Sequence, residues 1–106
     1  MNNKEKYLPI GTVVLLNGGK TRLMITGYAV INKEEKKMYD YCGCVFPYGI
    51  INSEQNLLFN HSDIKEIYAI GYQDEEQIKF ADKLKTELTG DNIKKLLDTV
   101  DNKKGE

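Results

Sequence analysis

The fold of this chain is decided by residues 8–20, which read LPIGTVVLLNGGK. Residues 12–16 are apolar and rich in β-branched side chains, and they are too few for a stable helix, so we expect a strand there. Asn17 and Gly18 are residue types that a type I′ turn places at positive φ. The stretch therefore predicts a tight hairpin, whose second strand covers residues 20–31, and an antiparallel sheet built around it.

Later segments extend this sheet. Residues 38–46 alternate in side-chain character and predict a third strand, and short apolar pieces at 50–51 and 57–59 are placed to pair as a further hairpin. Residues 60–64 have the pattern of a capped single turn, and residues 66–72 predict a last strand. A glycine in the middle of the second strand fits the bend of a strongly curved sheet or of a partly open barrel.

The C-terminal third predicts helices. Asp74 is a favourable N-cap residue with Gln77 three positions later, so we expect an amphipathic helix over 75–88. Gly90 is expected to end this helix, and Asp91 to cap a second one, whose narrow apolar stripe must pack on the body of the domain or on a partner. The predicted fold class is α+β: a small, strongly curved antiparallel β-sheet or partly open barrel of about five strands, followed by one or two C-terminal α-helices.

The length of the chain is that of one domain. We expect residues 1–106 to form it, with an antiparallel β part over 7–73, a helical part over 74–100, and frayed ends at 1–6 and 101–106. The N-terminus has neither the apolar core nor the cleavage site of a signal peptide, and no apolar run approaches the roughly 18 residues that span a bilayer. We therefore expect a cytoplasmic protein.

The charge balance excludes some classes of partner. The chain has 15 Lys and Arg residues against 16 Asp and Glu residues, and its formal net charge is -1. A balance of this kind gives no global attraction to a phosphate backbone or to an anionic membrane. We therefore expect neither nucleic-acid binding nor membrane insertion.

No residue pattern predicts catalysis, a cofactor or a metal. Cys42 and Cys44 are two residues apart on a predicted strand, which would strain a disulfide, and His61 is the only histidine, so we expect ordinary thiols rather than a metal or redox pair. His61, Ser62 and Asp63 do not form a catalytic triad, because adjacent side chains diverge. We expect a protein that is not an enzyme and that carries no cofactor.

Tyrosine is the one unusual feature of the composition, with seven tyrosines and no tryptophan. Several of them lie on or beside predicted strands, where an amphipathic ring lines either the edge of a core or a recognition surface. Both interpretations stay open at this stage. The residues that we predict to contact a protein partner are Tyr39, Tyr41, Tyr48 and Tyr72.

A set of short segments, taken in chain order, resembles one protein family. The segments are Leu8–Leu16, Arg22–Ile25, Tyr39–Tyr41, Pro47–Gly49, Phe59–Ile64 and Gly71–Glu76. In this order they resemble the unknown-function family numbered 4176, small proteins of Gram-positive bacteria that are encoded beside type VII secretion genes and LXG-type toxins. The resemblance covers residues 7–80 and is collinear rather than a single motif.

The resemblance implies a role for the protein. It implies a cytoplasmic accessory protein of type VII secretion, an adaptor or chaperone that binds a cognate LXG-type toxin before export. No catalytic residue belongs to the family pattern, so none is carried over to this chain. Two alternatives are an immunity protein that inhibits a toxin domain and a domain that binds or converts a small ligand.

Overall fold

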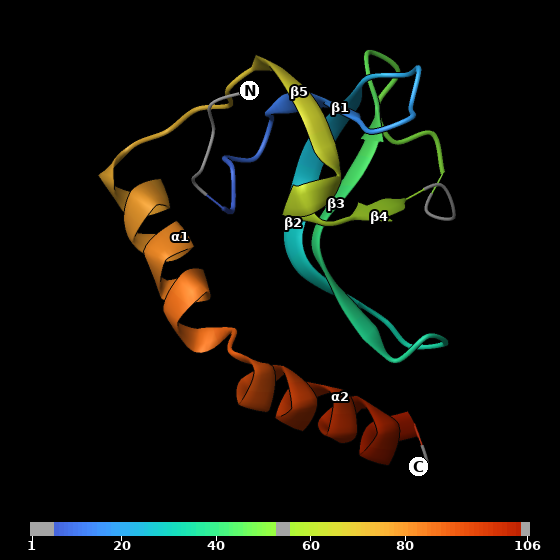
Figure 1. Cartoon of the computed structure of the whole chain (residues 1–106), viewed down its shortest axis with the longest axis vertical. Coiled ribbons are helices and arrows are strands. Elements are labelled where there is room, and N and C mark those ends of the chain that lie inside the picture. The colour runs from blue at the N-terminus through green and yellow to red at the C-terminus, as the bar shows by residue number, and fades with distance from the viewer. Residues whose placement is uncertain (1–5, 53–55, 105–106) are drawn as a thin grey trace.

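The computed structural model describes residues 6–52 and 56–104 and has an α+β fold (Figure 1). Within these residues, five strands form one open antiparallel sheet in the order β4-β3-β2-β1-β5, and two helices follow it in the chain. The elements are β1 (Val13–Leu16), β2 (Leu23–Asn32), β3 (Lys37–Val45), β4 (Leu57–Phe59), the 3-10 turn η2 (His61–Asp63), β5 (Ile64–Ala69), α1 (Glu75–Glu87) and α2 (Gly90–Lys104). The predicted sheet with C-terminal helices is confirmed, and the sheet is open.

The turn after β1 differs from the predicted type I′ hairpin. The backbone N–H of Gly19 donates to the carbonyl oxygen of Leu16 at 3.0 Å, and Gly18 alone among the residues of this turn has a positive φ, of 76°. A type I′ turn needs positive φ at both central residues, so the predicted turn type is wrong. β1 and β2 are antiparallel neighbours as predicted, but only Val13 and Val14 pair with β2, whereas the whole of β1 pairs with β5 on its other edge.

β4 also pairs differently from the prediction. Residues 57–59 pair with β3, with Phe59 opposite Tyr41, so the predicted hairpin between residues 50–51 and 57–59 is wrong. Burial explains the preference, because this pairing places the Phe59 ring in the core while the side chains of residues 50–51 stay exposed. The turn predicted over residues 52–56 lies partly outside the described residues.

The predicted irregularity in the second strand is present. The register of β2 against β3 shifts between Ile25 and Gly27. A Cβ on Gly27 would lie 2.8 Å from Sγ of Cys42, so a larger residue at this position would require the Cys42 side chain to shift. β5 ends at Ala69, earlier than the predicted end at Tyr72.

The helical boundaries are partly as predicted. The carboxylate of Asp74 accepts a hydrogen bond of 2.9 Å from the backbone N–H of Gln77, which confirms the predicted N-cap of α1. Gly90 begins α2 rather than ending α1. α2 continues to Lys104, so residues 101–104 are helical and not a frayed tail, while residues 1–5 and 105–106 lie outside the described residues.

The core lies between the sheet and the chain segment that precedes β1. Figure 1 shows this segment running between the sheet and α1. Its residues Tyr7 and Leu8 are buried, together with Val14, Ile25 and Tyr41 of the sheet. α1 thus packs on the sheet largely through the N-terminal segment rather than directly.

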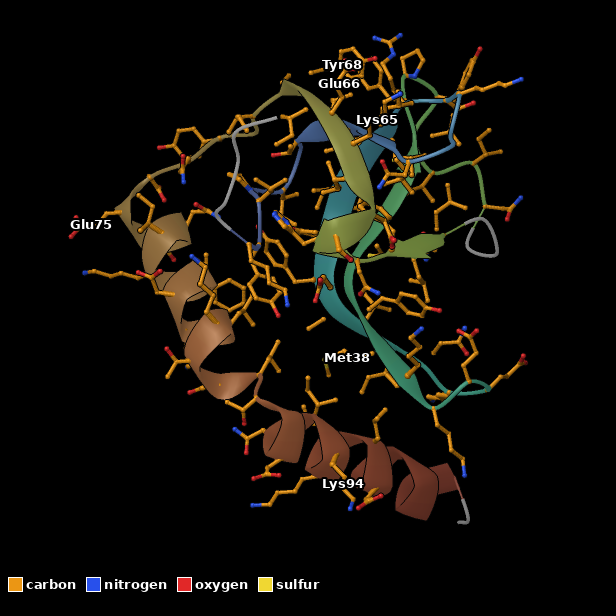
Figure 2. The ribbon with its side chains drawn as sticks, in the orientation of Figure 1. Met38, Lys65, Glu66, Tyr68, Glu75 and Lys94 are labelled. Carbon is orange, nitrogen blue, oxygen red and sulfur yellow. The ribbon has the colours of Figure 1, made fainter. Side chains whose placement is uncertain are left out.

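α2 lies beside the hairpin formed by β2 and β3 (Figures 1 and 2). Ile93 and Leu97 of its apolar stripe are half-buried, and Figure 2 places Met38 of β3 between the hairpin and this helix. Of the two packing surfaces that the sequence left open for this stripe, the structure uses the body of the domain. Among the described residues, no helix is both long and apolar enough to cross a membrane.

Candidate partner-binding surface

The four tyrosines predicted to bind a partner lie in different environments. Tyr72 is 81% exposed and Tyr48 is 75% exposed, so both present their rings to the surroundings. Tyr39 is half-buried, and its hydroxyl donates a hydrogen bond of 2.9 Å to the carboxylate of Glu35. Tyr41 is fully buried in the core. The prediction that Tyr41 belongs to a partner surface is therefore wrong.

Tyr41 is buried because its hydroxyl satisfies polar groups in the core. The hydroxyl oxygen accepts hydrogen bonds from the backbone N–H groups of Tyr7 at 2.9 Å and Leu8 at 3.1 Å. Nδ1 of His61 lies 2.7 Å from the same oxygen. Since the oxygen already accepts two bonds, its proton is directed to Nδ1, which assigns the remaining imidazole proton to Nε2.

The same environment shifts the acidity of this tyrosine. Burial raises the pKa of Tyr41 to about 12, and the charge of nearby Asp40 also raises it, while the two backbone donors act in the opposite direction. The hydroxyl is therefore held in its neutral form, as a structural group.

Tyr72 lies in an open apolar hollow between the N-terminal segment and α1. Apart from Tyr72, the apolar lining comes from Ile10, Tyr28 and Phe80, and the volume of the hollow is about 510 Å³. Ile10 is 46% exposed and Phe80 is 48% exposed, and the rings of Tyr28 and Phe80 are 5.9 Å apart. We call this site the Tyr72 hollow.

A close backbone approach positions Tyr72 beside Ile10. A Cβ on Gly71 would lie 2.1 Å from the carbonyl oxygen of Ile10, so only glycine fits at this point. The backbone N–H of Gly71 also donates a hydrogen bond of 3.0 Å to the hydroxyl of Thr12, which is fully buried. These two features fix the connection between β5 and α1 against the segment that leads into β1.

The polar part of the hollow comes from the first turn of α1. Asp74, Glu76 and Gln77 complete its lining, and the hollow has no lysine or arginine in its wall among the described residues. The side-chain nitrogen of Gln77 donates a bond of 3.4 Å to the carbonyl oxygen of Tyr7, while its oxygen Oε1 is buried and has no hydrogen-bond partner in the described part of the chain. The hollow thus combines an apolar floor with an acidic rim.

The described surface has two further features, a second cavity and a separate group of exposed apolar residues. A smaller cavity of about 180 Å³ between the N-terminal segment and α1 also has Gln77 in its wall, together with Leu8 and Ile78. A separate group of exposed apolar residues follows β3 and includes Tyr48 and Ile51. Of the four predicted tyrosines, Tyr72 lines the Tyr72 hollow, and Tyr39, Tyr41 and Tyr48 do not.

Residues with catalytic or metal-binding side chains are placed as follows. Cys42 is half-buried and Cys44 is buried, and both are free thiols. His61 is bound to Tyr41, and its backbone N–H donates to the carboxylate of Asp40 at 2.8 Å. Across residues 6–52 and 56–104, no group of three or more His, Cys, Asp or Glu side chains is arranged to hold a metal ion.

The sequence alone did not identify Ile10 and Phe80 as members of the site. Ile10 precedes the first strand, and nothing in the local sequence separates it from the apolar residues that enter the sheet. Phe80 lies off the apolar stripe of α1, which contains Ile78, Ala81 and Leu84. A large aromatic residue outside the core-facing stripe of a surface helix is the signal that points to Phe80.

Residues 7–80 match the family described as Domain of unknown function (DUF4176). The chain belongs to this family. No curated protein and no solved structure matches the chain. The part that matches the DUF4176 family includes Ile10, Tyr28, Tyr72 and Phe80, so the Tyr72 hollow lies within the family domain, whereas α2 lies beyond it.

Proposed function

We propose that this protein is a non-enzymatic accessory protein that binds a protein partner through the Tyr72 hollow. The observation that carries the proposal is the exposure of Tyr72, at 81%, beside two apolar side chains that are each about half exposed. Large apolar side chains gathered at an exposed concave surface are typical of an interaction site, and tyrosine is enriched among the residues that dominate binding energy. Ile10 and Phe80 supply the surrounding apolar contact.

The resemblance to proteins encoded with type VII secretion systems supports a more specific form of this proposal. In that form the protein is a cytoplasmic adaptor or chaperone, and its partner is a cognate LXG-type toxin that it binds before export. The concave, apolar site on a small domain suits this role, because an adaptor needs a stable surface and no reactive group. The proposal requires neither nucleic acid nor a cofactor.

A second form of the proposal assigns the protein to immunity. An immunity protein would bind the catalytic end of the toxin and abolish its activity, whereas an adaptor need not inhibit. The two forms share the same surface but differ in the part of the toxin that is bound. Toxin activity measured in the complex therefore separates them.

The experiment is co-purification of the protein with the LXG-type toxin encoded beside its gene. The Tyr72→Ala variant is expected to bind the toxin at least about tenfold more weakly, since truncation of a central aromatic side chain commonly costs this much or more. Tyr48→Ala is the matched control, because Tyr48 is similarly exposed but lies outside the hollow.

Each outcome has a distinct meaning. Binding that depends on Tyr72 with toxin activity intact supports the adaptor or chaperone, and binding with inhibition supports the immunity protein. Failure of the toxin to co-purify, or an equal effect of both alanine substitutions, would contradict the proposal.

A further inference from the structure

We infer that the segment held in the Tyr72 hollow presents a large apolar side chain next to a lysine or arginine. The inference rests on the proposed function and adds the chemistry of the bound segment. It depends on two features of the hollow: the apolar floor and the charge of the rim.

The apolar floor requires an apolar side chain from the partner. Ile10, Tyr28, Tyr72 and Phe80 line a hollow of about 510 Å³, in the size range of sites that hold a ligand group rather than a single water molecule. An apolar side chain that enters it removes the exposed faces of Tyr72 and Phe80 from water, which is the main favourable contribution to such binding.

The rim selects the charge of the neighbouring group. Asp74 and Glu76 both line the hollow, and Glu76 takes part in no ion pair among the described residues. Glu75 differs from Glu76, because it pairs with Lys79 at 3.4 Å and points away from the sheet in Figure 2. Glu76 is thus the carboxylate available to a cation in the hollow, and an acidic segment would be repelled.

Lysine and arginine carry the charge that this rim favours. Both side chains offer only hydrogen-bond donors, and arginine offers five in a planar arrangement that suits the two oxygens of a carboxylate such as that of Glu76.

The test uses three tetrapeptides as probes: acetyl-Gly-Leu-Arg-Gly-amide, the same peptide with Gln in place of Arg, and the same peptide with Glu. Binding to the full-length protein is followed by NMR shifts of the Tyr72 and Phe80 rings. We expect millimolar affinities in the order Arg, Gln, Glu, with about three- to fivefold between the Arg and Glu peptides, as exposed charges allow. This difference is expected to shrink at high salt, where exposed charges are screened.

Charge reversal in the protein provides the decisive comparison. Glu76→Lys is expected to reverse the order, so that the Glu peptide binds more tightly than the Arg peptide. Glu87→Lys is the matched control: it makes the same change at an exposed position of α1 outside the hollow and should leave the order unchanged. Equal affinity for all three peptides, no saturable shift at the two rings, or an order unaffected by Glu76→Lys would overturn the inference.

The inference and the proposed function fail separately. Toxin that is lost with Tyr72→Ala but retained with Glu76→Lys would support the proposed function and overturn the charge preference. Peptides that bind in the expected order to a protein that does not retain the toxin would support the inference and contradict the proposed partner.

Discussion

The hydroxyl of Tyr41 in β3 lies 2.7 Å from Nδ1 of His61 in the turn that precedes β5. The same hydroxyl accepts from the backbone N–H groups of Tyr7 and Leu8, so one side chain joins the sheet, the turn and the N-terminal segment. Tyr7 has a φ of 64°, in the left-handed region that is costly for a residue with a side chain. The hydrogen bonds to Tyr41 stabilise this conformation.

Tyr41→Phe is therefore expected to destabilise the fold by about 2–4 kcal/mol, because it leaves two buried backbone N–H groups and the His61 ring without their partner. Chemical denaturation followed by circular dichroism measures the change. Tyr39→Phe is the control, since it also removes one hydroxyl, but one that is bonded at the surface to Glu35, and it should change stability little. Equal losses of stability in the two variants would show that the buried hydrogen bonds of Tyr41 stabilise the fold no more than the surface bond of Tyr39 does.

Stability is expected to fall at alkaline pH because of Tyr41. Its pKa is raised from 10.0 to about 12, with burial as the main cause. Below pH 10 the Tyr41 hydroxyl is neutral in both the folded and the unfolded state, so its contribution to stability is complete. Between pH 10 and pH 12 the hydroxyl ionises in the unfolded chain but stays protonated in the folded protein. The free energy of unfolding should therefore fall by about 1.4 kcal/mol per pH unit from this group, and by about 2–3 kcal/mol in all.

The measurement for this prediction is urea denaturation at intervals from pH 8 to the alkaline limit of the fold. Burial also raises the pKa values of Tyr7 and Tyr28, so these two residues also contribute to the fall in the free energy of unfolding at alkaline pH. Tyr41→Phe removes only the contribution of Tyr41, and its pH profile should be shallower than that of the wild type. Parallel profiles for the two proteins would contradict the prediction.

Local sequence signals predicted the elements of this fold well, because short-range chemistry determines them. The apolar segment over residues 12–16 forms β1, and Asp74 caps α1 through a side chain that acts within one helical turn. The partners of these elements were harder to predict. β4 pairs with β3 and β1 pairs with β5, and these arrangements bury Phe59 and Ile64, so burial depends on residues distant in the sequence.

The candidate site shows the same division. Alternation placed Tyr39 and Tyr41 on the same face of β3, yet Tyr41 is buried and Tyr39 only half-buried. The difference arises from Tyr7 and Leu8, more than 30 residues away in the chain, which cover Tyr41 alone. Tyr72 could be selected from composition, but its hollow also needs Ile10, which lies before β1 at the opposite end of the β part of the sequence.

Cys42 and Cys44 are expected to remain reduced and to differ in reactivity. Cys44 is buried and Cys42 is half-buried, with its Sγ 3.5 Å from the hydroxyl of Thr26. Iodoacetamide should therefore alkylate Cys42 first in the folded protein and both residues equally in denaturant, because access limits the reaction. Peptide mass spectrometry measures the two rates, and an intact mass lower by two hydrogens would instead reveal a disulfide.

Gly71→Ala is expected to disrupt both the fold and the Tyr72 hollow. The new Cβ would lie 2.1 Å from the carbonyl oxygen of Ile10 and 3.0 Å from the backbone nitrogen of Thr12, and neither backbone atom yields as a flexible side chain would. We expect a loss of stability of about 2–3 kcal/mol, of the size caused by overpacking. The displacement of Ile10 from Tyr72 should also weaken partner binding.

Gly90→Ala is the control for this substitution. Gly90 begins α2, and a Cβ there meets no atom within 4 Å, so the variant should be as stable as the wild type or slightly more stable, by up to about 1 kcal/mol. Thermal unfolding measures both variants, and binding of the arginine tetrapeptide reports on the hollow. If Gly71→Ala matches the wild type in both measurements, the chain between β5 and α1 does not need its close contact with Ile10, and the geometry of the Tyr72 hollow has another cause.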